Sequence, residues 1–191
     1  MGKIIPRWEW RTFSEDLTES EVLIKETGLK IERESSEIYI LSTNSNDNTK
    51  IREELMDIKT PIRIKDGLEQ WTVLTKASFP IHINDLALVF KAFNVELPLL
   101  EKDELNYEEY IQLINDTKEL TMVDVYKHRF GYMVGEAIVE IAEGKFNDFT
   151  YKTIAVEHTD PKLVMDTVKK LKLDKFENVN YIKAMKSSVW K

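Results

Sequence analysis

Hydrophobic and polar residues alternate one by one over many short stretches of this chain. A period of two is typical of β-strands with one apolar and one polar face. In residues 7–13 the odd positions begin Arg, Glu, Arg, whereas Trp8 and Trp10 share the other face. The same pattern predicts about eight strands, at residues 7–13, 37–41, 50–52, 57–59, 70–76, 123–132, 136–143 and 151–157. Most connections have hairpin length, which favours antiparallel pairing.

Helix-start signals fall between the predicted strands. Asp160 followed by Pro161 predicts a helix to about Leu171, because aspartate caps a helix and proline suits its first turn. Ser14, Asn84 and Asn106 are the other predicted caps, for helices over residues 15–26, 85–93 and 107–119, and a last short helix is expected over 181–186. No linker or repeat divides the chain, so we expect a single domain over residues 1–191.

The polar face of the predicted strands is rich in arginine and lysine, with single acidic residues among them. Two geometries fit this pattern. In an open sheet the polar face meets solvent, and alternation alone favours this geometry because solvated strand faces are common. In a closed barrel of eight strands the polar face points inward, and amphipathic helices cover the apolar outer face.

Composition narrows the class of protein. A chain of 191 residues that is 42% hydrophobic can form a folded core. It lacks the run of roughly 18 to 20 apolar residues that a membrane helix needs, and its first residues lack an apolar leader, so we expect a cytoplasmic protein with no membrane partner. The absence of cysteine excludes disulfides, thiolate zinc sites and cysteine nucleophiles. The glycine spacing matches neither a dinucleotide-binding nor a P-loop motif.

The net charge of −7 conceals an uneven distribution. The largely helical segments 15–34 and 96–119 carry net charges of −4 and −6, so the rest of the chain is net positive by three charges. The basic residues therefore concentrate in the predicted strands. Acidic helices would repel duplex nucleic acid, which binds through basic contacts to its phosphates, so we expect no duplex partner.

The order of these charged positions resembles the CYTH superfamily, the triphosphate tunnel metalloenzymes, over residues 7–186. Glu9-x-Arg11 resembles a degenerate copy of the Glu-x-Glu-x-Lys signature that opens the family. The later landmarks follow in family order: Lys50-Ile51-Arg52, residues 71–76, Lys127-x-Arg129, Glu140 and residues 153–157. The resemblance implies an α+β fold, a closed eight-stranded antiparallel β-barrel or tunnel with helices packed on its outer face.

The resemblance also implies a function. It predicts a metal-dependent hydrolase that uses Mg²⁺ or Mn²⁺ and acts on inorganic tri- or polyphosphate, or on an organic triphosphate, as a triphosphatase. By position, Glu9, Glu140 and Glu157 would be metal ligands; Glu9, Arg11, Lys127 and Arg129 catalytic; Lys50, Arg52, Lys59 and Lys76 substrate-binding. The residue types suit this role, since Mg²⁺ prefers carboxylate oxygens and arginine and lysine bind phosphate oxygens.

Three positions depart from the family pattern. Arg7 stands where the family has a glutamate, Arg11 where it has a lysine, and Ala155 where it has a second late glutamate. Asp57, Glu37 and Glu136 are the candidate replacement ligands. The missing acids keep open an alternative function, a catalytically weak polyphosphate- or nucleotide-binding module. A class IV-type adenylyl cyclase is a further alternative.

Overall fold

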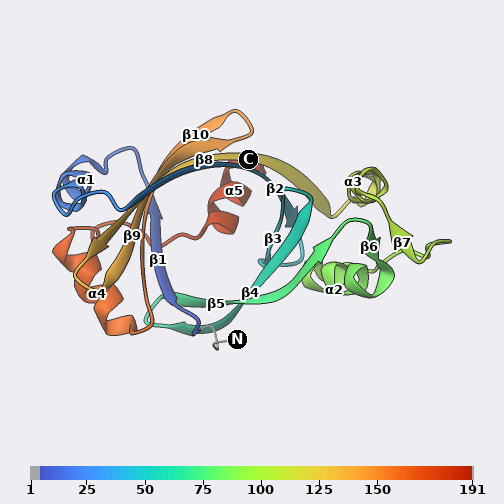
Figure 1. The fold of residues 1–191 in the computed structure, drawn as a ribbon, viewed down its shortest axis with the longest axis horizontal. Coiled ribbons are helices and arrows are strands. Elements are labelled where there is room, and N and C mark those ends of the chain that lie inside the picture. Colours follow the sequence, from blue (N-terminus) through green and yellow to red (C-terminus); the bar gives the residue numbers. More distant parts are fainter. Residues whose placement is uncertain (1–4, 191) are drawn as a thin grey trace. The chain divides into compact units, whose positions relative to one another are not determined.

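The structure is a computed structural model that describes residues 5–190. Figure 1 shows the order of its elements, which are β1 (Trp8–Phe13), α1 (Thr18–Lys25), β2 (Ile31–Ser42), β3 (Asn48–Arg52), β4 (Leu55–Lys65), β5 (Leu68–Ser78), β6 (Ile81–His82), α2 (Ile83–Phe93), β7 (Glu104–Leu105), α3 (Tyr107–Asp116), β8 (Leu120–Val134), β9 (Ala137–Phe146), β10 (Phe149–His158), α4 (Pro161–Lys170) and α5 (Tyr181–Val189). Each of the eight predicted strands is present. The pair β6 and β7 was not predicted, because two residues are too short to show alternation.

Eight of the strands form a ring. Hydrogen-bonded neighbours follow the order β1-β10-β9-β8-β2-β3-β4-β5, and β5 pairs back with β1. The pairings of β10 with β9, β2 with β3 and β3 with β4 are antiparallel, as the hairpin-length connections predicted. The first strand, β1, also pairs antiparallel with β10. Alternation alone favoured an open sheet, whereas the family resemblance implied a closed one, and the pairing of β5 with β1 closes the ring.

The chain divides into two compact units. One comprises the residues up to Ser35, Pro61–Trp71 and the residues from Tyr126 onward, and the other comprises Ser36–Thr60 and Thr72–Val125. Strands β2, β4, β5 and β8 each begin in one unit and end in the other. The two units thus share four continuous strands, and the single domain expected from the sequence stays a prediction.

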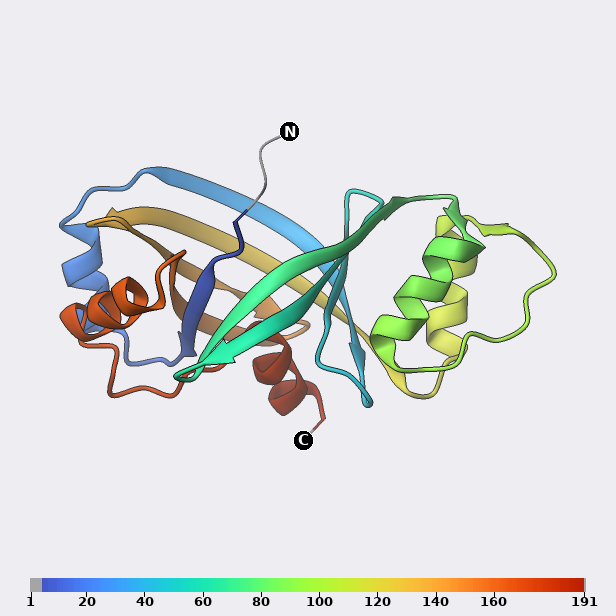
Figure 2. The ribbon, with the colours of Figure 1, turned by 90° about the horizontal axis from the view of Figure 1, so that it is seen from below.

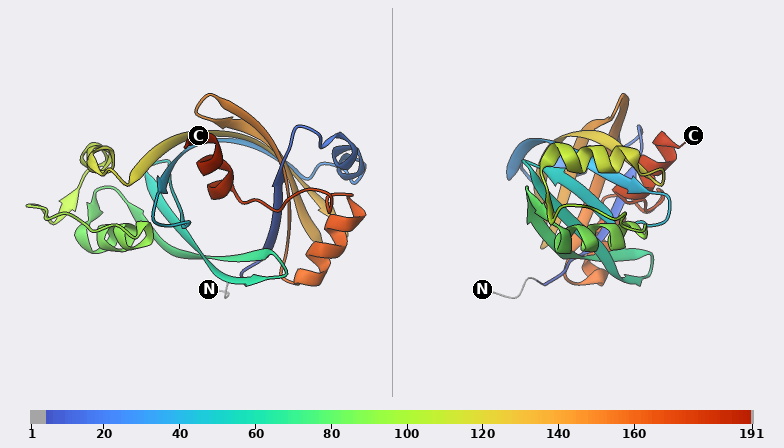
Figure 3. Two further views of the ribbon diagram at one scale, coloured as in Figure 1. Left: turned by 180° about the vertical axis from the view of Figure 1, so that it is seen from behind. Right: turned by 90° about the vertical axis from the view of Figure 1, so that its right-hand side faces the viewer.

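The core of the first unit lies on the apolar face of β1, β9 and β10. Trp8 and Trp10 point into it together with Ile154 and Val156, and helices α1 and α4 cover this face. Figure 3 shows α4 lying against these strands. Burial of each such large apolar side chain contributes about 1.5–3 kcal/mol. The opposite face of β1 carries Glu9 and Arg11, as the alternation predicted, and also Phe13, whose ring contacts Tyr181.

The core of the second unit lies between β2, β3, β4 and the helices α2 and α3, which lie side by side in Figure 2. Its largest fully buried residues include Phe90, Phe93 and Tyr110 from the two helices and Met56 and Ile58 from β4. Ile40 and Ile51, on neighbouring strands, complete the strand side. Lys50 and Asp57 lie opposite one another on the other face of these strands.

Two of the four predicted helix caps are confirmed and two are corrected. Asn106 forms a capping box with Glu109, and Asp160 caps α4. Ser14 does not cap α1: its N–H donates to Lys152 and extends the β1–β10 ladder, so the helix begins only at Thr18. Helix α2 is capped by the His82 ring, which accepts a hydrogen bond from the Asn84 N–H, so it begins before the predicted cap.

Candidate functional site

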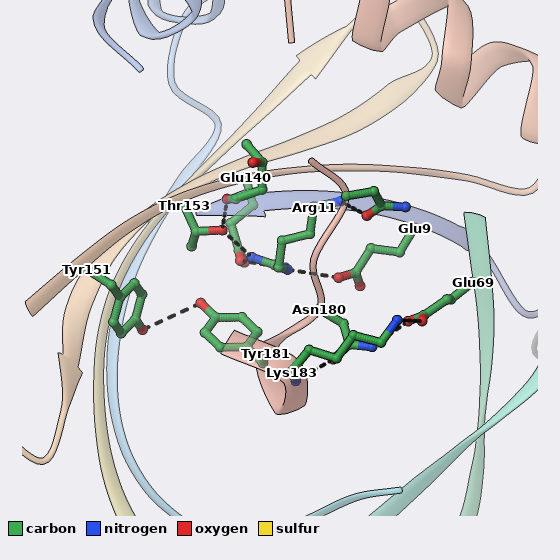
Figure 4. A network of polar contacts seen from close by, with 11 residues as sticks. Glu9, Arg11, Glu69, Glu140, Tyr151, Thr153, Asn180, Tyr181 and Lys183 are labelled. Atoms are coloured by element: carbon green, nitrogen blue, oxygen red, sulfur yellow. Dashed lines mark hydrogen bonds and ion pairs between the residues drawn. The ribbon is translucent and has the colours of Figure 1, made fainter. Parts of the chain in front are cut away.

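The site begins with the polar face of β1. Glu9 and Arg11 lie on it because the tryptophans between and before them occupy the opposite, core-facing side. Arg11 is only 4% exposed. Its Nε donates to Glu9 Oε1 at 2.8 Å, its Nη2 to Glu140 Oε1 at 3.3 Å, and its Nη1 to the Thr153 hydroxyl at 3.4 Å. Figure 4 shows the guanidinium between these partners.

The charge of Arg11 is stabilised inside the protein. Burial opposes a charged guanidinium, but the negative charges around it, chiefly that of Glu9, raise the pKa of Arg11 well above its usual value. The side chain is therefore a permanent cation. A buried cation of this kind requires paired carboxylates or a bound anion to offset its loss of hydration.

The strand register places four carboxylates on the same face of the sheet as Arg11. Glu69 on β5 lies opposite Glu9, and Glu9 lies opposite Glu157 on β10, so three glutamates form one row across three adjacent strands. Glu140 on β9 lies opposite Ala155, which itself lies opposite Arg11. Directly opposed residues share a face of the sheet. We call Glu9, Glu69, Glu140 and Glu157 the carboxylate cluster.

Sequence reasoning missed Glu69. It began the strand at Gln70, whereas β5 begins at Leu68, directly after a two-residue turn in which Asp66 and Gly67 have φ of 52° and 80°. The Asp-Gly pair is a strong hairpin signal and could have extended the strand. At this end of β5, Gln70 lies opposite Trp8 and so shares the core-facing side with it. Pairing with β1 sets which face of β5 meets the core, and the sequence of residues 70–76 does not.

Each carboxylate of the cluster contacts a cationic side chain. Arg11 contacts two of them, Arg7 lies 3.4 Å from Glu157, and Lys183 lies 3.1 Å from Glu69. Burial, followed by the nearby charge of Glu9, raises the pKa of Glu157, and the charge of Arg11 only partly opposes this rise. Glu157 thus binds a proton more readily than an ordinary glutamate.

Helix α5 and its cap supply the remaining side chains of the site, which contact Arg11, Lys127 and Glu69. Its Tyr181 ring lies 4.5 Å from the Arg11 guanidinium and 4.2 Å from Lys127 Nζ, both cation–π contacts. Asn180, which caps α5, and Lys183 both donate to Glu69 (Figure 4). Burial raises the pKa of Tyr181 well above its usual value, so the phenol stays neutral. The sequence predicted this short helix but gave no signal that it would meet β1.

Lys127 and Arg129 both belong to the first unit. Lys127 is 4% exposed. Arg129 Nη2 donates to the Ser35 hydroxyl at 3.1 Å, and its buried Nε has no hydrogen-bond partner among residues 5–190. Tyr126 and His128, the alternate residues of β8, contact Glu34 and Glu32 instead. Tyr126 and His128 therefore lie on one face of β8 and Lys127 and Arg129 on the other, as a period of two predicts. The Nε of Arg129 is a donor without an acceptor in the described part of the chain.

The four predicted substrate-binding residues lie in the second unit. Lys50 Nζ lies 3.2 Å from Glu37 and 5.7 Å from the Tyr39 ring centroid, and Arg52 lies 3.6 Å from Glu37. Burial lowers the pKa of Lys50, and the negative charge of Glu37 only partly opposes this effect. Lys59 and Lys76 are exposed. No contact here tests a role in substrate binding, so for all four residues that role stays a prediction.

The residues do not fit a bound divalent metal as they are arranged. Carboxylates are suitable ligands for Mg²⁺ or Mn²⁺. Within residues 5–190, however, no three acidic or histidine side chains are placed to hold an ion together. Arg11 donates to Glu9 and Glu140 instead, and Glu157 lies 3.4 Å from Arg7. Glu136, a candidate replacement ligand, is exposed just after Gly135 in the β8–β9 turn, and Glu37 and Asp57 lie in the second unit.

Comparison with known proteins identifies the fold. No family model and no curated protein matches the sequence. HpAC1 from Hippeastrum, described as a putative adenylyl cyclase with a dominant triphosphatase activity, is 9% identical with a TM-score of 0.54, over 95% of this chain and 96% of that one. PH1012 from Pyrococcus horikoshii OT3 is 16% identical with a TM-score of 0.53, over 92% and 97%. This chain therefore shares its fold with both proteins.

Among residues 5–190, each helix is too short or too polar to cross a bilayer.

Proposed function

We propose that this chain binds the phosphate chain of inorganic tri- or polyphosphate, or of an organic triphosphate, and hydrolyses its terminal phosphoryl group. The observation that carries this proposal is the pair of buried cations, Arg11 and Lys127, on one tyrosine ring beside the carboxylate cluster. Buried cations at this density are costly without carboxylates or a polyanion nearby. The fold shared with HpAC1, a protein described as a triphosphatase, supports the same substrate class.

The proposed reaction is an in-line attack of water on the terminal phosphorus. The bond from the water oxygen to phosphorus forms as the bridging P–O bond breaks, the rest of the phosphate chain leaves, and Glu9 accepts the proton that the water loses and returns it to the leaving phosphate oxygen. Arg11 and Arg129 present forked donors, and Lys127 a point charge, to the oxygens on which negative charge is spread. Glu9, 25% exposed and adjacent to Arg11, would orient the attacking water. Because the carboxylates do not fit a metal ion, the proposal assigns no step to one.

A second candidate function is binding of the same polyanions without turnover. Two observations favour it. First, Arg7 and Ala155 occupy positions where the family that the sequence resembles has acids. Second, each of the four carboxylates of the carboxylate cluster contacts a cationic side chain. A carboxylate that is already bound by an arginine is a weaker acceptor for a water proton.

The two candidates are separated by measuring tripolyphosphate binding by calorimetry and phosphate release by a colorimetric assay. Both measurements are made with EDTA, with Mg²⁺ and with Mn²⁺. Release that disappears in Glu9→Gln, while binding and the melting temperature persist, supports the hydrolase. Binding without release supports the second candidate. If the protein shows neither binding nor release, both candidates are contradicted. If the Glu9→Gln variant still releases phosphate, Glu9 has no part in the mechanism.

A further inference from the structure

The starting observation is how Arg11 reaches across the sheet. In the register, Arg11 on β1 lies opposite Ala155 on β10, and Ala155 lies opposite Glu140 on β9. Arg11 and Glu140 are thus separated by two strand spacings, roughly 10 Å between backbones. The two side chains nevertheless meet, at 3.3 Å between Nη2 and Oε1.

This contact requires a small residue in the middle of the row. Ala155 has only a methyl group, and it is completely buried. A longer side chain at this position would occupy the space that the guanidinium crosses. The family that the sequence resembles has a glutamate there and a lysine at position 11, so the two departures, Arg11 and Ala155, are complementary in space.

The guanidinium is held on four sides. It donates to Glu9, Glu140 and Thr153 and lies 4.5 Å from the centroid of the Tyr181 ring. Arginine can do this because its five donors form a rigid planar fork, whereas lysine has a single ammonium. Arginine also cannot release its proton to make room for another cation. The oxygens that Arg11 binds, on Glu9 and Glu140, are the ones that a divalent ion between β1 and β9 would need.

We propose that Arg11 is a built-in cation that takes the place of a divalent metal in the carboxylate cluster, so that this chain binds tri- or polyphosphate without a metal ion held by its own side chains. The inference that phosphate binds without a metal ion rests on the proposed function. The inference that Arg11 takes the place of a metal in the carboxylate cluster does not, because it follows from the contacts of Arg11 and Ala155 alone.

The first test measures Mn²⁺ binding to the full chain by electron paramagnetic resonance, without phosphate. We expect no stoichiometric binding to the wild type. The double variant Arg11→Lys/Ala155→Glu removes the fork and adds a fifth carboxylate, and its affinity for Mn²⁺ should rise about tenfold or more. Its matched control is Arg11→Lys/Ala155→Gln, which has nearly the same shape without the added charge and should gain much less.

Stoichiometric Mn²⁺ binding by the wild type overturns the inference. This measurement does not depend on whether the variants fold. Equal Mn²⁺ affinity in the two folded double variants and the wild type also overturns it. The second test is tripolyphosphate binding to the wild type in EDTA. Binding there supports the inference, and binding that appears only with added Mg²⁺ or Mn²⁺ contradicts it while leaving the proposed function intact. Absence of binding under every condition contradicts the proposed function, and the Mn²⁺ measurement then still decides the role of Arg11.

Discussion

Lys127 and Lys170 carry the same charge in different surroundings. Lys127 is buried against Tyr181, whereas Lys170, in the last turn of α4, is exposed. A charged group that loses its hydration on folding contributes strongly to binding if an anion replaces the lost water, since charge-assisted hydrogen bonds exceed ordinary ones in strength. For the binding of an anion, the position of a lysine in this protein therefore matters more than the number of lysines.

We predict that Lys127→Ala weakens tripolyphosphate binding by about tenfold to a hundredfold, the loss of one charge-assisted hydrogen bond. Lys170→Ala is the matched control and should leave affinity unchanged. Calorimetric titration checks the affinities, and the melting temperature without ligand checks the fold. A fall in melting temperature with unchanged affinity would show that Lys127 has a structural role only.

Glu157 makes the stability of the protein depend on pH. Its pKa is raised in the folded state by burial and by the charge of Glu9, so the folded state favours the protonated form. The stability from this group is complete below the ordinary carboxyl pKa and is lost as the pH rises through the raised value. At neutral pH the ionised carboxylate therefore disfavours folding.

We predict that Glu157→Gln raises the free energy of unfolding at neutral pH. The difference from the wild type should vanish in acid, where Glu157 is itself protonated. Urea denaturation at several pH values measures this, with Glu136→Gln in the exposed β8–β9 turn as the control. A variant that is less stable than the wild type at neutral pH would mean that the exposed Arg7 contact outweighs the cost of burying the charge.

At the scale of elements, close approach between strands depends on one glycine of β9. A Cβ at Gly144 would overlap the carbonyl oxygen of Tyr126 on β8 and lie 2.7 Å from the Tyr151 hydroxyl. Backbone cannot move aside as a flexible side chain can. At Gly131 on β8, by contrast, the close contact of the Cβ would be with the Ile31 side chain, which is 48% exposed, and the backbone oxygen of Ile31 would lie at an ordinary 3.8 Å.

We predict that Gly144→Ala lowers the free energy of unfolding by about 3 kcal/mol and Gly131→Ala by less than about 1 kcal/mol. Urea denaturation monitored by circular dichroism gives both values. Similar losses in the two variants would contradict the close contact between β8 and β9 that the structure shows.

At the scale of the whole molecule, the two compact units share four strands. Strands β2, β4, β5 and β8 each supply residues to both units, so unfolding of one unit removes backbone partners from strands of the other. The four tryptophans, Trp8, Trp10, Trp71 and Trp190, all belong to the first unit, whereas helices α2 and α3 belong to the second. Tryptophan fluorescence therefore reports on the first unit, whereas far-ultraviolet circular dichroism reports on the helices of both units.

We predict that the urea transitions seen by tryptophan fluorescence and by far-ultraviolet circular dichroism coincide, as they do in a two-state domain. Coincident midpoints and slopes would support the single domain expected from the sequence. A circular dichroism transition that continues after the fluorescence change is complete would show instead that the second unit folds independently.

The local features of this protein could be predicted from the sequence because they depend on neighbouring residues. Alternation revealed all eight strands of the ring, and the Asp160-Pro161 pair marked the start of α4, since backbone geometry and capping act over a few residues. The same alternation placed Glu9 and Arg11 on the face opposite Trp8 and Trp10. The charged face of β1 was therefore predictable.

Pairing between distant segments decided the rest. Closure of the ring, the row from Glu69 to Glu157, and the position of Tyr181 against Arg11 each join residues more than 50 positions apart. Alternation says which residues share a face, but it does not say which strand lies next to which, and a shift of one residue exchanges the two faces. Only the folded chain showed that Arg11 crosses above Ala155 to Glu140, because that contact depends on two pairings at once.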